Sequence, residues 1–106
     1  MTKTNWHEIL HLLQQSVPEG TITTYGDLSL KFYGHKVGGQ AIGTMLGTAV
    51  ERDARNVRFT NRVIRNDGQL IKHNGQASQL IKEGIPLKDG RVDLLKANRA
   101  ELGGCV

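Results

Sequence analysis

The side chains that could carry chemistry in this 106-residue chain are few and widely separated. His7 and His11 stand one helical turn apart and could share a metal ion, but no third ligand completes the set. Cys105 is the single cysteine, and no base stands beside it in the glycine-rich end of the chain. No nucleophile-elbow, zinc-site or phosphate-loop spacing is present, and no carboxylate pair suggests acid–base catalysis. The residues alone therefore predict no catalytic centre, no metal site and no cofactor.

The positive charge of the chain is concentrated in one central segment. The whole sequence has a net charge of +4, whereas residues 31–72 hold eight basic and three acidic residues. The rest of the chain holds six basic and seven acidic residues. A continuous basic segment attracts phosphate and favours a nucleic acid as partner. The alternative is a solvated basic face that maintains solubility.

Length and composition indicate one globular domain over residues 1–106 with a single hydrophobic core. No apolar run approaches the roughly 20 residues that span a bilayer, and the first residues lack the apolar stretch of a secretory signal. A lone cysteine is compatible with a reducing compartment. We therefore expect a cytoplasmic protein without a membrane partner, and nothing in the sequence requires more than a monomer.

Hydrophobic spacing and cap residues predict a mostly α fold with a small β-hairpin. The predicted helices are Asn5–Gln15, Tyr25–Phe32, Gly39–Val50, Gln76–Glu83 and Val92–Ala100. The predicted hairpin runs from Val63 to Ile71 around Asp67-Gly68, and a further turn is expected at residues 88–90. The second and third helices fit a helix-turn-helix, and a hairpin beside such a pair makes a winged helix-turn-helix.

The third predicted helix has two unusual features. It contains no charged residue, and Gly39, Gly43 and Gly47 repeat every four residues along one face. Each glycine inside a helix costs about 1 kcal/mol relative to alanine. The bare face therefore serves either close approach to a nucleic-acid groove or tight packing against a neighbouring helix.

The order of several motifs resembles a known family. Residues 18–28 read Pro-Glu-Gly-Thr-Ile-Thr-Thr-Tyr-Gly-Asp-Leu, residues 37–46 read Val-Gly-Gly-Gln-Ala-Ile-Gly-Thr-Met-Leu, and residues 62–68 read Arg-Val-Ile-Arg-Asn-Asp-Gly, before Glu83-Gly84. In this order they resemble the C-terminal domain of O6-alkylguanine-DNA alkyltransferases. The similarity covers about residues 5–97 and is greatest to the alkyltransferase-like proteins, which lack the acceptor cysteine.

The resemblance implies a protein that does not transfer alkyl groups. The family's Pro-Cys-His-Arg-Val motif matches residues 59–63, where Thr60 replaces the acceptor cysteine and Asn61 replaces its histidine. The family's network runs from cysteine through histidine and water to a glutamate, of which Glu83 remains. Because a threonine hydroxyl without an adjacent base is a poor nucleophile, we expect no catalysis.

The resemblance also implies how DNA would be bound. The helix from Gly39 would enter the minor groove, and Tyr25 would push a phosphate and rotate a nucleotide out of the stack. Gln40 stands where members of that family place an arginine, which fills the space that the rotated nucleotide leaves in the base stack. The residues expected to contact DNA are Thr24, Tyr25, Gly39, Gln40, Ala41, Gly43, Thr44 and Arg62. Those expected to form the lesion pocket are Tyr25, Thr60, Asn61, Val63, His73 and Asn74.

Several of these residues have a structural alternative. Tyr25 could pack beside Trp6, Arg62 could bridge elements of the fold, and Arg55 and Arg58 could be surface charge or additional phosphate contacts. The resemblance implies double-stranded DNA containing alkylated guanine as the partner, with nucleotide excision repair proteins as downstream partners. The alternatives are a lesion-independent DNA binder or regulator, an alkyltransferase with another acceptor, and a protein-interaction module.

Overall fold

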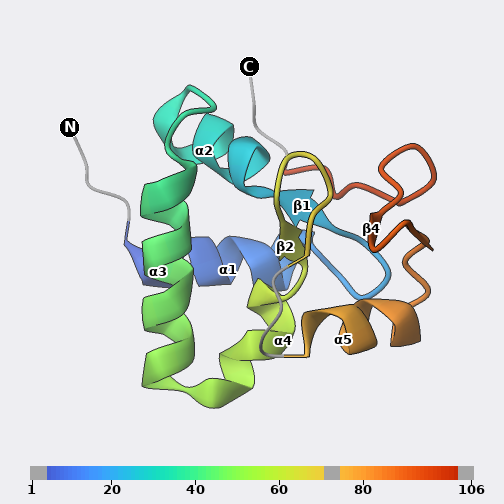
Figure 1. Cartoon of the computed structure of the whole chain (residues 1–106). Helices are drawn as coiled ribbons and strands as arrows, with labels where there is room; N and C mark the ends of the chain where they lie inside the picture. The colour runs from blue at the N-terminus through green and yellow to red at the C-terminus, as the bar shows by residue number, and fades with distance from the viewer. Residues whose placement is uncertain (1–4, 71–74, 103–106) are drawn as a thin grey trace.

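A computed structural model describes residues 5–70 and 75–102 of the chain (Figure 1). Within these residues the elements follow in the order α1 (Trp6–Ser16), β1 (Thr23–Thr24), α2 (Tyr25–Tyr33), α3 (Gly39–Arg52), the 3-10 helix η1 (Ala54–Asn56), α4 (Val57–Thr60), β2 (Val63–Ile64), α5 (Gln76–Lys82), β3 (Leu87–Lys88) and β4 (Arg91–Val92). The fold is mostly α with small β pairings, as the sequence predicts. No helix in the described part is both long enough and apolar enough to cross a bilayer.

The first helices begin at the predicted caps. The Asn5 side chain accepts a hydrogen bond from the Glu8 backbone at 3.1 Å, and the Glu8 carboxylate accepts one in return from the Asn5 backbone. Thr24 Oγ1 accepts a hydrogen bond from the Asp27 backbone at 3.0 Å and starts α2. These bonds satisfy backbone donors that the helix itself leaves unpaired.

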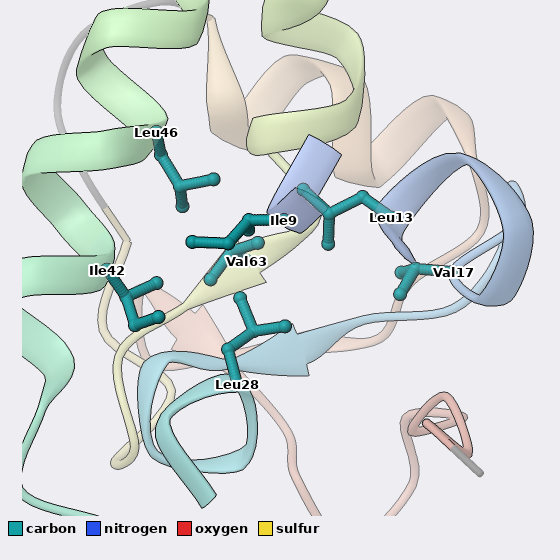
Figure 2. Close-up of a cluster of buried hydrophobic side chains, with 7 residues drawn as sticks. All are labelled: Ile9, Leu13, Val17, Leu28, Ile42, Leu46 and Val63. Atoms are coloured by element: carbon teal, nitrogen blue, oxygen red, sulfur yellow. The ribbon is translucent and has the colours of Figure 1, made fainter. Parts of the chain in front are cut away.

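The buried core joins α1, α2, α3 and β2. Seven side chains form its main cluster and point towards one another in Figure 2: Ile9, Leu13, Val17, Leu28, Ile42, Leu46 and Val63. A second cluster contains Ile22, Ile64, Leu80, Ile85 and Val92. Because successive residues of a strand point to opposite faces, Val63 reaches the first cluster and Ile64 the second.

The strand pairing differs from the predicted hairpin of residues 63–71. Val63 and Ile64 pair in parallel with Thr23 and Thr24, and across the Asp67-Gly68 turn the Arg65 N–H donates to the Gln69 carbonyl at 3.4 Å. The turn itself is present, since the Gly68 N–H donates to the Arg65 carbonyl at 2.9 Å. Both strand residues of β2 are fully buried, because the two core clusters cover the two faces of the strand, whereas a wing on the surface would leave one face exposed. The expected end of the hairpin, Ile71, lies outside the described residues.

The antiparallel hairpin lies later in the chain. β3 and β4 pair around Asp89 and Gly90, which adopt φ angles of 54° and 80°. The predicted turn at residues 88–90 is therefore confirmed. The predicted helix Val92–Ala100 is wrong, because the Val92 N–H donates to the Gly68 carbonyl and the Ala100 N–H donates to the Ile22 carbonyl. Long-range backbone pairing replaces the helical bonds that the local pattern favoured.

Candidate nucleic-acid interface

An open hollow of about 400 Å³ lies where three parts of the chain meet. Its described lining comes from the start of α2, the first turns of α3 and the loop after β2, and consists of Tyr25, Gly39, Gln40, Gly43, Arg65 and Asn66. Four of these residues are among those that the sequence assigned to DNA contact. The fold therefore brings them to one place although α2 and the loop after β2 are far apart in the sequence.

Tyr25 lies along the glycine face of α3. A Cβ atom added at Gly39 would come within 3.3 Å of the Tyr25 Cβ, and one at Gly43 would come within 3.7 Å of its Cε1. Packing against Tyr25 thus accounts for Gly39, whereas Gly43 has room for a methyl group at ordinary contact distance. No atom of residues 5–70 or 75–102 lies within 4 Å of a Cβ added at Gly47, apart from its own chain neighbours and helix backbone. Packing against these residues therefore does not explain why position 47 is a glycine.

The phenol of Tyr25 is suited to donate a hydrogen bond at neutral pH. Burial raises the pKa of Tyr25, and the positive charge of Arg65 opposes part of that rise. Because the group stays protonated, its hydroxyl can donate to a phosphate oxygen or a base edge. Tyr25 also packs at the edge of the main core cluster, so it contributes to stability as well. Trp6, the expected packing partner of Tyr25 in the structural alternative, stacks on His7 with ring centres 3.6 Å apart.

The outer face of α3 is polar but uncharged over its first three turns. Gln40, Ala41, Thr44 and Gly47 are exposed there, and the first turn contains no acidic residue and no side-chain cap. Positive partial charge at a helix N-terminus is left uncompensated when the first turn lacks a carboxylate. The electrostatic environment of this face therefore does not repel a polyanion.

The turn between α2 and α3 is fixed by one buried side chain. Ser29 Oγ donates to the His35 carbonyl at 2.5 Å and accepts from the Gly38 backbone at 2.8 Å. A Cβ at Gly38 would lie 2.7 Å from the same oxygen. This close packing sets the angle at which α3 leaves the turn, and with it the position of Gln40.

Two residues predicted to contact DNA are committed to the interior instead. Thr24 is 2% exposed, and its hydroxyl caps α2. The Arg62 guanidinium forms a two-nitrogen ion pair with the Glu83 carboxylate, at 3.0 Å from Nε and 2.9 Å from Nη2, and donates at 3.2 Å to the Val17 carbonyl. Both side chains of the pair are more than nine-tenths buried. Arg62 therefore bridges elements of the fold and is corrected from a DNA contact to a structural residue.

Thr60 and Asn61, in the segment that resembles the alkyltransferase motif, form hydrogen bonds to a backbone carbonyl and to a side-chain amide. Thr60 Oγ1 donates to the Val57 carbonyl at 3.3 Å, while Asn61 Nδ2 donates to Gln79 Oε1 at 3.0 Å. Gln79 Nε2 in turn donates to Glu83 Oε2 at 3.0 Å. The chain of contacts from Asn61 to the glutamate thus contains only carboxamides, which do not relay protons as imidazole does.

Glu83 is a weak base in this setting. Burial alone would raise the pKa of Glu83, but hydrogen bonds from Arg62, the Gly20 backbone and Gln79 outweigh it and hold the pKa below its ordinary value. A carboxylate held ionised by an arginine has little tendency to take up a proton. It is suited to fixing the fold rather than to activating a neighbouring hydroxyl.

The described residues of the predicted lesion pocket have different surroundings. Val63 is fully buried in the main core cluster, which corrects its assignment to the pocket wall. Thr60 and Asn61 are not among the described residues that line the hollow at Tyr25. His73 and Asn74 lie outside the described residues.

The remaining basic residues of the central segment have other surroundings. Arg55 pairs with Asp53 at 2.8 Å on the surface, and its hydrogen bonds lower the pKa of Asp53 to about 2. Arg58 lies over the Phe59 ring at 4.8 Å.

Within residues 5–70 and 75–102, no three histidine, cysteine, aspartate or glutamate side chains gather closely enough to hold a metal ion.

Comparison with known proteins gives one curated relative and no matching protein-family model. The relative is named a bifunctional methyltransferase/endonuclease and comes from Picrophilus torridus. It is 32% identical over an alignment 98 residues long, and the alignment covers 89% of this chain. The chain spans 32% of the relative's length, so the activities in that name belong to a protein about three times as long.

Sequence reasoning missed Arg65 and Asn66 as members of the hollow. Asn66 Oδ1 accepts a hydrogen bond from the Gly26 backbone at 2.8 Å, and a Cβ at Gly26 would lie 2.8 Å from the same oxygen. This contact fixes the loop after β2 against the start of α2. The Asp-Gly turn was visible in the sequence, but the parallel strand pairing that carries the loop to Tyr25 was not.

Proposed function

We propose that this chain binds double-stranded DNA through the exposed face of α3 and recognises alkylated guanine there without reacting with it. The observation that carries the proposal is the open hollow at the start of α3, where Tyr25, Gly39, Gln40, Gly43 and Arg65 converge. A hydrogen-bond donor, a cation and bare backbone are thereby placed beside one uncharged helix face. These are the groups that minor-groove binding requires.

Close approach of backbone to DNA gives the glycine row a use. The minor groove is about 6 Å wide in B-form DNA, so a helix can enter only if its leading face is small. Gly43 and Gly47 meet this requirement, and Gly47 has no internal packing role. The name of the relative, which combines a methyltransferase with an endonuclease, supports a role at nucleic acid.

Absence of alkyl transfer is the second part of the proposal. It is supported by the Thr60 hydroxyl bonding to a backbone carbonyl, by the carboxamide contacts of Asn61 and by the ion pair of Glu83. No thiolate or activated hydroxyl is present in this segment. By the family resemblance, a bound lesion would pass to another repair system, for which we propose nucleotide excision repair.

The absence of alkyl transfer predicts that the protein stays unlabelled. Incubation with duplex DNA carrying a radiolabelled O6-methylguanine, followed by denaturing electrophoresis, should leave all label on the DNA. An active alkyltransferase treated in parallel shows that the DNA is competent. Stoichiometric label on this protein would contradict the proposal and would direct attention to Cys105.

Lesion-independent DNA binding is the second candidate. It is favoured by Gln40, which supplies neither a cation nor a stacking guanidinium, and by the described lining of the hollow, which does not include Thr60. The two candidates differ in the affinity ratio between damaged and intact duplex. Fluorescence anisotropy titrations at several salt concentrations should give at least about tenfold tighter binding to the O6-methylguanine duplex, equivalent to about 1.4 kcal/mol. Equal affinities would establish the second candidate, and no binding at low salt would exclude both.

Tyr25 provides a more specific test of nucleotide rotation. Tyr25→Ala should weaken binding to the lesion duplex more than binding to intact duplex, because only the former depends on an extruded nucleotide. Tyr25→Phe keeps the ring packed against Gly39 and Gly43 and removes only the hydroxyl, so it separates the contribution of the hydroxyl from that of the ring. An equal loss on both duplexes would argue against rotation of a nucleotide.

A further inference from the structure

Arg65 differs from several other arginines of the chain in its partners. Arg55, Arg62 and Arg99 each form an ion pair with a carboxylate at 2.7–2.9 Å. Arg65 instead has a long contact of 3.4 Å to the neutral amide of Gln69. Its side chain is exposed at the edge of the hollow. Moving this guanidinium onto a ligand would therefore break no ion pair among the described residues.

The position of Arg65 is fixed by its backbone and by its neighbour. The Arg65 carbonyl accepts from the Gly68 backbone at 2.9 Å, which closes the turn, and Asn66 holds the next residue to the start of α2. Arg65 and Tyr25 line the same hollow, and the positive charge of Arg65 opposes the rise in the pKa of Tyr25 that burial causes. A single anion in the hollow could thus receive hydrogen bonds from both side chains.

We infer that Arg65 binds a DNA backbone phosphate together with the Tyr25 hydroxyl, and so supplies the cation that Gln40 does not. This inference rests on the proposed DNA binding. A guanidinium presents two parallel N–H donors that match two oxygens of one phosphate. The tyrosine hydroxyl adds a third donor. A phosphate gripped at this point lies directly beside the first turns of α3, where the helix meets the groove.

Salt dependence distinguishes a phosphate contact from a general effect of charge. Each phosphate neutralised by a protein cation contributes about 0.9 to the slope of log K against log salt concentration on B-form DNA. Arg65→Gln should therefore weaken binding to intact and damaged duplex by the same factor, about three- to tenfold near 0.1 M salt, and reduce the slope by about 1. Arg65→Lys should keep the slope, because lysine retains the charge.

Arg55→Gln is the matched control. It removes the same charge from an exposed arginine that is paired with Asp53 away from the hollow, and it should leave the slope unchanged. An unchanged slope for Arg65→Gln, or an equal decrease for Arg55→Gln, would overturn the inference while leaving DNA binding itself intact. Failure of the unaltered protein to bind any duplex would instead overturn the proposed function on which the inference rests.

Discussion

Replacing Arg62 with leucine is expected to lower the free energy of unfolding by about 3–5 kcal/mol. The substitution removes the cation from an ion pair whose side chains are 9% and 7% exposed. Glu83 would then be buried with hydrogen bonds from Gly20 and Gln79 but without a compensating charge. The Val17 carbonyl would also lose its donor at the end of α1. The large effect comes from leaving the Glu83 carboxylate buried without a cation, rather than from losing its attraction to Arg62.

Urea denaturation followed by circular dichroism measures this loss. Arg55→Leu is the control, because its ion-paired side chain is 90% exposed and exposed pairs contribute at most about 1 kcal/mol. A loss below 1 kcal/mol for Arg62→Leu would show that the pair does not hold the fold together.

The same pair predicts a dependence on pH. The folded-state pKa of Glu83 is lowered, so its stabilisation is present above about pH 4.3, the ordinary glutamate value, and is lost as the pH falls through the folded pKa. In the Arg62→Leu variant the carboxylate lacks its cation and its pKa should rise. Protonation of Glu83 then removes the buried charge. The difference in the free energy of unfolding between the variant and the unaltered protein should therefore become smaller in acid.

Gly47→Ala is expected to stabilise the protein and to weaken DNA binding at once. Alanine in a helix interior is favoured over glycine by about 1 kcal/mol, and none of the residues that the structure describes obstructs the added methyl group. If α3 lies in the minor groove, the same methyl group prevents close approach of the helix, and we expect an affinity loss of about tenfold. The two effects have opposite signs, so unfolding cannot account for the weaker binding.

Ser78→Ala is the control for Gly47→Ala. Ser78 is exposed on α5, and the substitution raises helix propensity by a smaller amount without altering α3. Thermal unfolding and duplex titration are measured on both variants. Unchanged affinity for Gly47→Ala would place this part of α3 outside the DNA contact.

Four of the five predicted helices match α1, α2, α3 and α5 closely because their signals are local, whereas the predicted helix Val92–Ala100 is not formed. Asn5 and Thr24 mark the starts of α1 and α2, and Gly34 and Gly84 lie just beyond the ends of α2 and α5. The short helices between residues 54 and 60 were not predicted, because Asp53, which caps the first of them, directly follows the end of α3. The strand pairing was also missed, since residues 23 and 63 come together only through the core.

The site could be predicted only in part for a related reason. Spacing singled out the glycines of α3 and the family resemblance suggested Tyr25, and the fold brings Tyr25, Gly39 and Gly43 together. The same reasoning offered Arg62 as a DNA contact, because sequence does not show whether an arginine has a buried carboxylate within reach. Arg65, three residues later, is exposed at the hollow. Burial thus distinguishes an arginine that holds the fold together from one that remains exposed on the surface.

Mapping of the DNA contact by amide chemical shifts tests the central claim most directly. Isotope-labelled protein is titrated with a duplex containing O6-methylguanine. The largest shifts are expected at Tyr25, at residues 39–47 of α3 and at Arg65 and Asn66, with little change on α5 or on the hairpin of β3 and β4. Shifts concentrated on α5 and that hairpin, with α3 unaffected, would contradict the claim that this protein meets DNA through the hollow at the start of α3.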